Sequence, residues 1–290
     1  AVTAFERPAG AAMIANVMPQ RLLQQGTAMS SAALQLATIC GPALGGLIYL
    51  LSPGAPYLAC TGFWLIAGAL NGAVATTRQA VSTAATTWES LFAGVRFVWR
   101  NPLIFGTISL DLFAVLLGGA TALLPIYAAE VLHAGPVGLG LLRSAPAAGA
   151  LLITAVLARR PLQEHAGMRM FQAVIVFGLA TLVFGASTQL WLSLIALVVM
   201  GAADAISVVI RLSLVQLRTP DEMRGRVSAV NFLFVNASNQ LGEFRAGMSA
   251  AVFGAVSAVV IGGAGTVAVA ALWARMFPDL RRARHLDGRT

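Results

Sequence analysis

The sequence has little charge. Charged residues make up 10% of the 290-residue chain, whereas soluble domains usually carry about 25%. The chain is 58% hydrophobic and has a mean hydropathy of +0.81, so it has too few polar groups to cover a water-facing surface. This composition excludes a water-soluble globular protein. It predicts an integral membrane protein with the lipid bilayer as its partner.

Cysteine and histidine are also scarce. Cys40 and Cys60 both fall in apolar runs, and they form neither a disulfide framework nor a metal spacing. The three histidines, His133, His165 and His285, lie in connections or in the tail. The sequence contains no recognisable nucleophile–base pair, metal cluster or phosphate-binding loop. We therefore expect no enzyme activity, no metal and no cofactor.

Long apolar runs are what the sequence does contain. A membrane helix needs roughly 20 apolar residues. Short joints and clusters of Pro, Gly or charge separate the runs, so the pattern predicts eight transmembrane helices in an all-α integral membrane protein. The runs that qualify are 27–50, 57–76, 103–128, 138–157, 168–187, 190–210, 228–250 and 254–277.

The net charge of +8 comes entirely from arginine, because lysine is absent. In a soluble protein such an excess would suggest nucleic acid, but here it reports membrane topology and we expect no nucleic-acid partner. When the N-terminal segment and every second connection are placed in the cytoplasm, only Arg143 and Arg245 fall outside the cytoplasmic side. The positive-inside rule favours this orientation. It predicts a cytoplasmic (inner) membrane protein whose N-terminal segment and C-terminus are both cytoplasmic.

Two of the cytoplasmic connections contain helix signals. Residues 86–102 place apolar side chains at helical spacing, with Arg96 and Arg100 on the other face. They predict either an amphipathic helix at the inner membrane surface or a packed linker helix. At 219–227, Thr219 as N-cap and Pro220 at the first helical position predict the start of the next helix.

Three stretches resemble one family. "CGPALGG" (40–46) resembles the Gly-Pro signature in the fifth helix of major facilitator superfamily exporters. "ESLFAGVRFVWRNP" (89–102) and "TPDEMRGRVSAVN" (219–231) resemble two cytoplasmic loops of the enterobactin-exporter-like branch, which includes drug and siderophore efflux proteins. The resemblance covers essentially the whole chain.

The resemblance implies a twelve-helix transporter of which the eight runs are helices five to twelve. Because the chain starts at Ala1, partway through a helix-like segment, we expect an N-terminally truncated form. The implied parts are a remainder of the N-terminal half (1–76), a central cytoplasmic loop (77–102), the C-terminal six-helix half (103–277) and a cytoplasmic tail (278–290).

The resemblance also implies a function. Two six-helix halves would surround a central cavity and export a small amphipathic molecule, such as a siderophore or drug, by alternating access driven by protons. We expect a monomer with a small-molecule substrate and protons as its partners. The alternatives are an importer or uniporter of the same fold, or a membrane protein that does not transport or is inactive through truncation.

The Gly-Pro signature has a physical interpretation of its own. Gly41 and Gly45 form a G-x-x-x-G pair, which permits close approach of a second helix, and Gly46 extends the small surface. Pro42 removes one backbone donor and can kink its helix. The stretch therefore predicts a hinge or seal, with generic membrane packing as the alternative.

Ionisable residues within the runs are the main site candidates, because each costs about 2.5–3.5 kcal/mol to insert. Asp111 lies roughly 12 Å from the cytoplasmic end of its helix, and Asp204 lies roughly 10 Å above Arg211. Arg211 lies at the cytoplasmic edge of its run and is itself a candidate for proton coupling or for the cavity. The two carboxylates should therefore come to similar depth. They are either a proton-coupling site, since desolvation favours a protonated carboxyl, or a structural hydrogen bond or ion pair.

The remaining charges lie in the outer part of the predicted spans. Arg143 and Glu243 could pair across the outer mouth, as a moving gate or as a static clamp. Arg245 could extend outward to the membrane surface. Three polar residues, Asn236, Asn239 and Gln240, align with Glu243 at helical spacing and predict a polar stripe on the wall of a substrate cavity.

Overall fold

The computed structural model describes residues 20–73, 88–159 and 165–282, and the regular structure in these ranges is helical. All eight predicted runs coincide with helices. The elements are α2 (Gln20–Tyr49), α3 (Ala55–Ala73), α4 (Trp88–Arg100), α5 (Pro102–Gly118), η1 (Thr121–Leu123), α6 (Leu124–Ile126), η2 (Tyr127–Val131), α7 (Gly135–Arg159), α8 (Ala166–Ala186), α9 (Leu190–Arg218), α10 (Asp221–Phe253), α11 (Ala255–Met276) and α12 (Pro278–Arg282).

Among the described residues, five helical stretches are long and apolar enough to cross a membrane. They run from α5 through η2, and along α7, α8, α9 and α11. The other three predicted spans, α2, α3 and α10, are also helices, but they are not among these five stretches. The membrane crossing of these three remains a prediction.

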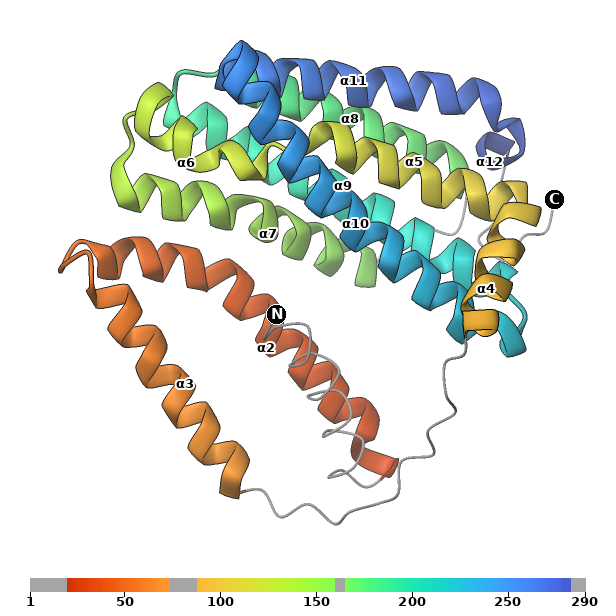
Figure 1. Ribbon diagram of the computed structural model, residues 1–290, viewed down its shortest axis with the longest axis horizontal. Coiled ribbons are helices and arrows are strands. Elements are labelled where there is room, and N and C mark those ends of the chain that lie inside the picture. Colours follow the sequence, from red (N-terminus) through yellow and green to blue (C-terminus); the bar gives the residue numbers. More distant parts are fainter. Residues whose placement is uncertain (1–19, 74–87, 160–164, 283–290) are drawn as a thin grey trace.

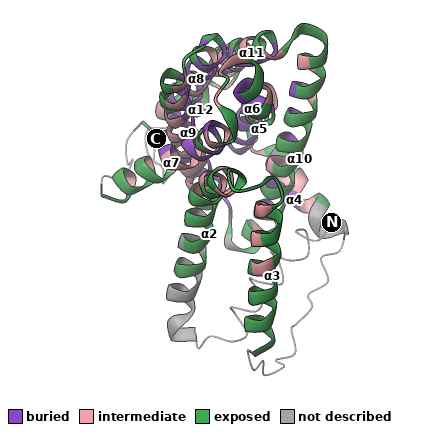
Figure 2. Cartoon of the chain, turned by 90° about the vertical axis from the view of Figure 1, so that its left-hand side faces the viewer, coloured by how far each residue is buried: buried purple, intermediate pink, exposed green. Residues whose placement is uncertain are grey.

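The helices form a bundle with an attached pair (Figure 1). In the bundle α9 packs between α7 and α8, α11 packs on α8 and α5, and α10 packs on α5. The pair, α2 and α3, reaches the bundle through the contact of α2 with α7. Helix α3 has no buried residue, and Figure 2 shows it exposed along its length. The core of the described chain therefore lies within residues 88–282.

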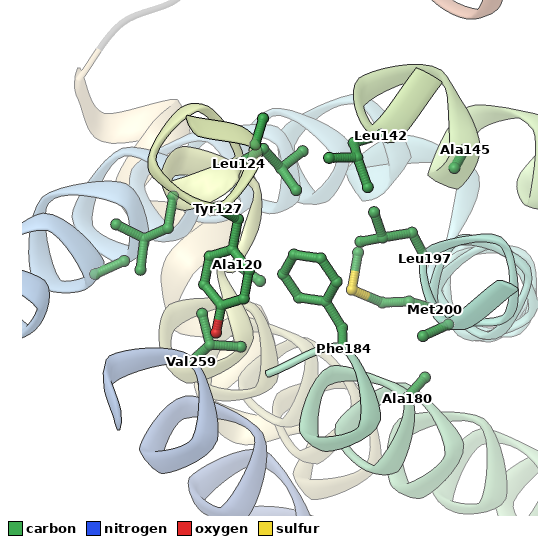
Figure 3. Packing of buried hydrophobic residues seen from close by; sticks show 14 of the residues in the cluster. Ala120, Leu124, Tyr127, Leu142, Ala145, Ala180, Phe184, Leu197, Met200 and Val259 are labelled. Carbon is green, nitrogen blue, oxygen red and sulfur yellow. The ribbon is translucent and has the colours of Figure 1, made fainter. Parts of the chain in front are cut away.

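One end of the bundle is held by a cluster around Tyr127 (Figure 3). The Tyr127 ring stacks on Phe184 with a centroid distance of 4.6 Å. Its hydroxyl donates a hydrogen bond of 3.1 Å to the carbonyl of Gly185, so the buried polar atom is satisfied. Leu142 and Leu197 pack against this pair and bring α7 and α9 into the same core.

The run 103–128 is not one continuous helix, as predicted, but is broken after Gly118. Gly119 ends α5 with a non-helical ψ of 75°. The chain then continues through η1, a short α6 that contains Pro125, and the π-helical η2. Two successive glycines and a proline explain the break, since both residue types weaken an α-helix.

The start of α10 differs from the prediction in its cap. Thr219 does not cap α10; its hydroxyl donates to the carbonyl of Val215, one turn back in α9, at 2.6 Å. The residue before α10 is Pro220, which has no side-chain donor or acceptor. At the other end, the short joint predicted at 250–254 is confirmed, and Gly254 makes it at a φ of +82° that favours glycine.

Candidate functional site

A buried ion pair joins α5 to α9 at the centre of the site. The Arg211 Nη2 lies 3.3 Å from Oδ2 of Asp111, and the two side chains are 4% and 6% exposed. Arg211 also donates from Nη1 to the side-chain oxygen of Asn231 on α10, at 3.0 Å. Three helices thus meet at one guanidinium group. Breaking a buried pair by removing one partner typically costs about 3–5 kcal/mol.

A second carboxylate, Asp204, lies beside this pair. Asp204 precedes Arg211 by two helical turns on α9 and is within electrostatic range of both Asp111 and Arg211. Asp111, Asp204 and Ser207 line a small cavity whose other walls are apolar. Its volume of about 10 Å³ is close to the minimum needed for one water molecule.

The arrangement contains two carboxylates and one guanidinium in an apolar surrounding. If all three are ionised, Asp111 and Asp204 leave one excess negative charge, which is costly where the dielectric constant is low. Binding one proton removes the excess. One proton on either carboxyl group would thus balance the charge of this group while Arg211 stays charged.

Sequence reasoning expected Asp111 and Asp204 at similar depth, and the structure brings them to one cavity. It did not foresee that Arg211 binds Asp111, nor that Asn231 and Ser207 take part. Positions 204, 207 and 211 are spaced i, i+3 and i+7, which is a helical face that the sequence shows.

Arg143 and Glu243 are not brought together. Among the described residues the structure shows no ion pair between them, and both side chains are exposed. Arg143, on α7, lines a cavity of about 690 Å³ together with Tyr49 and Tyr57 from α2 and α3. Glu243 lies on α10. In this conformation the pair is neither a closed gate nor a clamp.

Arg245 points inward rather than outward. Its Nε donates to the carbonyl of Leu116 at 2.9 Å, and its Nη2 donates to the carbonyl of Leu117 at 2.5 Å. These carbonyls belong to the last turn of α5, which lacks intrahelical partners for its oxygens. A cation is favourable there because the C-terminus of a helix carries partial negative charge. Arg245 thus caps α5 at its break, and the expected outward extension is wrong.

The polar stripe on α10 is exposed along its length. The side chains of Asn236, Asn239, Gln240 and Glu243 all face away from the packed bundle. Asn236 donates from its amide to the carbonyl of Phe232, at 2.8 Å. That the stripe lines a substrate cavity remains a prediction.

The small residues of the Gly-Pro signature divide into two groups. A methyl group at Gly46 would lie 2.6 Å from the carbonyl oxygen of Pro136, and one at Gly140 would lie 2.5 Å from that of Pro42. These two glycines allow α2 and α7 to approach. Gly41 and Gly45 have no atom within 4 Å of such a position. The predicted close approach exists, but Gly46 makes it.

The fold, the buried charges and the apolar helices fit a membrane transporter, and the comparison with known families agrees. The profile of the Major Facilitator Superfamily matches residues 1–243, and the chain belongs to this family of multi-pass membrane transporters.

Individual relatives are more distant. An uncharacterised MFS-type transporter of Bacillus subtilis, YvqJ, is 26% identical over 99% of this chain and 70% of its own length. The enterobactin exporter EntS of Citrobacter koseri is 28% identical over 94% of this chain and 66% of its own length. The multidrug efflux pump Tap of Mycobacterium tuberculosis is 28% identical over 85% and 62%. The resemblance to enterobactin-exporter-like members is confirmed, and the chain spans about two thirds of the length of these relatives.

Proposed function

We propose that this chain is part of a secondary active transporter that exports a small amphipathic molecule across the cytoplasmic membrane in exchange for protons. Its main support is the buried group of Asp111, Asp204 and Arg211. Charges placed within membrane-spanning helices are costly, and they are typical of ion and proton pathways. Export is favoured over import because EntS and Tap are named as an exporter and an efflux pump.

In the proposed cycle Asp111 and Asp204 alternate between a shared proton and full ionisation. Arg211 holds Asp111 when it is ionised, and a proton on Asp111 weakens that contact. Because α5, α9 and α10 all meet at Arg211, the change in charge is felt by three helices at once. Proton binding can thereby bias which side of the membrane the cavity faces.

The proposed topology places one end of the bundle in the cytoplasm. Helices α7, α9 and α11 end, and α8 begins, with arginine in the terminal turn at this end: Arg159, Arg218, Arg275 and Arg169. The opposite end has the cluster around Tyr127 and the exposed Glu130. This asymmetry supports the proposed orientation of the bundle. The division into 1–76, 77–102, 103–277 and 278–290 and the place of the polar stripe on a cavity wall remain proposals, and residues 1–19, 74–87, 160–164 and 283–290 lie outside the described part of the chain.

The test measures loss of preloaded probes from an efflux-deficient bacterial host that expresses the full-length protein. The probes are ethidium, an amphipathic cation, and 2-naphthoate, an amphipathic anion. We expect the wild type to expel at least one probe faster than the empty host, and a protonophore to stop it. Asp111→Asn and Asp204→Asn should reduce this energised efflux to the background at equal amounts of membrane-inserted protein.

The matched control is Asp279→Asn, because Asp279 is an exposed carboxylate on α12, outside the buried group. Its efflux should equal that of the wild type. If the wild type moves neither probe, or if Asp111→Asn keeps protonophore-sensitive efflux, the proposed function is wrong. If the wild type instead accumulates a probe when energised, the direction is import.

A further inference from the structure

Arg211 has a donor that the described contacts leave unused. Its Nη2 faces Asp111 and its Nη1 binds Asn231, but its Nε is buried and has no hydrogen-bond partner. The whole residue is 3% exposed. A buried donor without a partner costs about 1–3 kcal/mol, and more on a charged group. The Arg211 guanidinium therefore has a hydrogen-bond donor that no described protein group satisfies.

The contact with Asp111 is also loose. Its 3.3 Å separation exceeds the roughly 2.7–2.9 Å of a strong charge-assisted hydrogen bond. Arginine presents several donors in a planar fork that matches a carboxylate. The Arg211 guanidinium in this conformation thus retains the capacity to bind a second acidic group.

A cavity suited to such a group lies on the α10 side of Arg211. It measures about 370 Å³, within the usual range for small-ligand sites. Arg211 is the charged residue among those that line it. Gln216, Ser228 and Asn231 add polar groups, and Phe232 adds an apolar ring. The lining combines one cation, several hydrogen-bonding groups and an aromatic surface.

We propose that this cavity between α9 and α10 binds the carboxylate of an aromatic, amphipathic substrate through Arg211, with the substrate ring against Phe232. The inference rests on the proposed function, since it names the substrate class of the same transporter. In this arrangement the substrate carboxylate and Asp111 compete for one guanidinium. Neutralising Asp111 therefore strengthens substrate binding, and occupation of the cavity loosens the contact between α5 and α9.

The test is equilibrium binding to the full-length protein in nanodiscs of phosphatidylcholine, whose headgroup has no net charge. Calorimetry compares 2-naphthoate with its uncharged isostere 2-naphthamide. We expect naphthoate to bind about tenfold more tightly, as suits a charge-assisted contact. Asp111→Asn should raise the affinity for naphthoate several-fold and leave that for naphthamide unchanged. A purely structural Arg211 would not produce a gain in affinity that is confined to the anionic probe.

Further variants locate the site. Ser228→Leu fills the cavity and should abolish the preference for naphthoate, whereas Ala229→Leu, at the exposed neighbouring position outside the cavity lining, should retain it. Arg211→Gln should also abolish the preference. Because that change leaves Asp111 unpaired and can prevent folding, the double variant Asp111→Asn with Arg211→Gln serves as its folded counterpart.

Three results would overturn the inference: no binding of naphthoate, equal binding of the two probes, or weaker naphthoate binding in Asp111→Asn. Nanodiscs that include phosphatidylglycerol separate the sources of acidic group. If that lipid displaces naphthoate completely, the cavity is a lipid site and the substrate assignment is wrong. If the two probes bind equally but protonophore-sensitive efflux is intact, only the substrate class is wrong. If efflux is not coupled to protons, the proposed function is wrong.

Discussion

Two adjacent glycines of α2 should respond oppositely to the same substitution. Gly46 faces the carbonyl oxygen of Pro136 on α7, and a methyl group there would lie at 2.6 Å. Ordinary van der Waals contact begins at 3.4 Å, so α2 and α7 would have to separate by about 0.8 Å. A methyl group at Gly45 meets no atom within 4 Å and would project into the cavity between the helices.

The expected size follows from two effects. Replacing glycine by alanine within a helix stabilises by roughly 0.5–1 kcal/mol, and this gain applies to both positions. Overpacking at a close contact costs about 1–3 kcal/mol and applies only to Gly46. Because the shared gain cancels, Gly46→Ala should be less stable than Gly45→Ala by about 1–3 kcal/mol.

The assay is thermal unfolding of the full-length protein in detergent, followed by tryptophan fluorescence at one heating rate. The midpoint of Gly46→Ala should fall about 2 °C or more below that of Gly45→Ala. Gly140→Ala, whose methyl would lie 2.5 Å from the carbonyl of Pro42, should resemble Gly46→Ala. Equal midpoints for the two α2 variants would refute the close approach of α2 and α7.

Two further predictions concern arginines that bond other helices. Arg245→Ala should lower the free energy of unfolding by about 1–3 kcal/mol, because the carbonyls of Leu116 and Leu117 lose charged donors. A thermal unfolding midpoint equal to that of the wild type would contradict the capping role. The effects of Asp111→Asn and Arg211→Gln on the free energy of unfolding should be strongly non-additive. The double variant should be at least about 2 kcal/mol more stable than the sum of the two single effects predicts. Simple additivity would show that the ion pair contributes nothing.

The helices were predictable because membrane crossing imposes a length of apolar sequence that few other structures need. Within the described residues each of the eight runs falls on helices, and only the run 103–128 is interrupted. The break at Gly119 was missed because the run 103–128 stays apolar across it. Hydropathy measures how favourably a residue enters lipid and says nothing of backbone geometry. The residues that indicated the helix break were Gly118, Gly119 and Pro125.

The sequence predicted the charged residues of the site, Asp111, Asp204 and Arg211, but not Asn231 or Ser207, and it predicted the contacts only in part. Depth along a helix follows from the rise per residue, which placed Asp111 and Asp204 at one level. Which side chain reaches which depends on how α5, α9 and α10 cross, and sequence spacing within one helix does not contain that information. The pairing of Asp111 with Arg211, and the inward turn of Arg245, required the structure.

Helix α10 is rich in polar residues, and several of them make contacts that join the other helices. It is the least apolar of the long helices, yet it supplies Asn231 to Arg211 near one end and Arg245 to α5 near the other. Its polar stripe lies between these two contacts. A helix that faces only lipid could not hold so many polar groups, whereas one that borders an aqueous cavity can. Helix α10 is thus bonded to α9 through Asn231 and to α5 through Arg245, so a movement that opens the α9–α10 cavity must strain or release the hydrogen bond between Arg211 and Asn231.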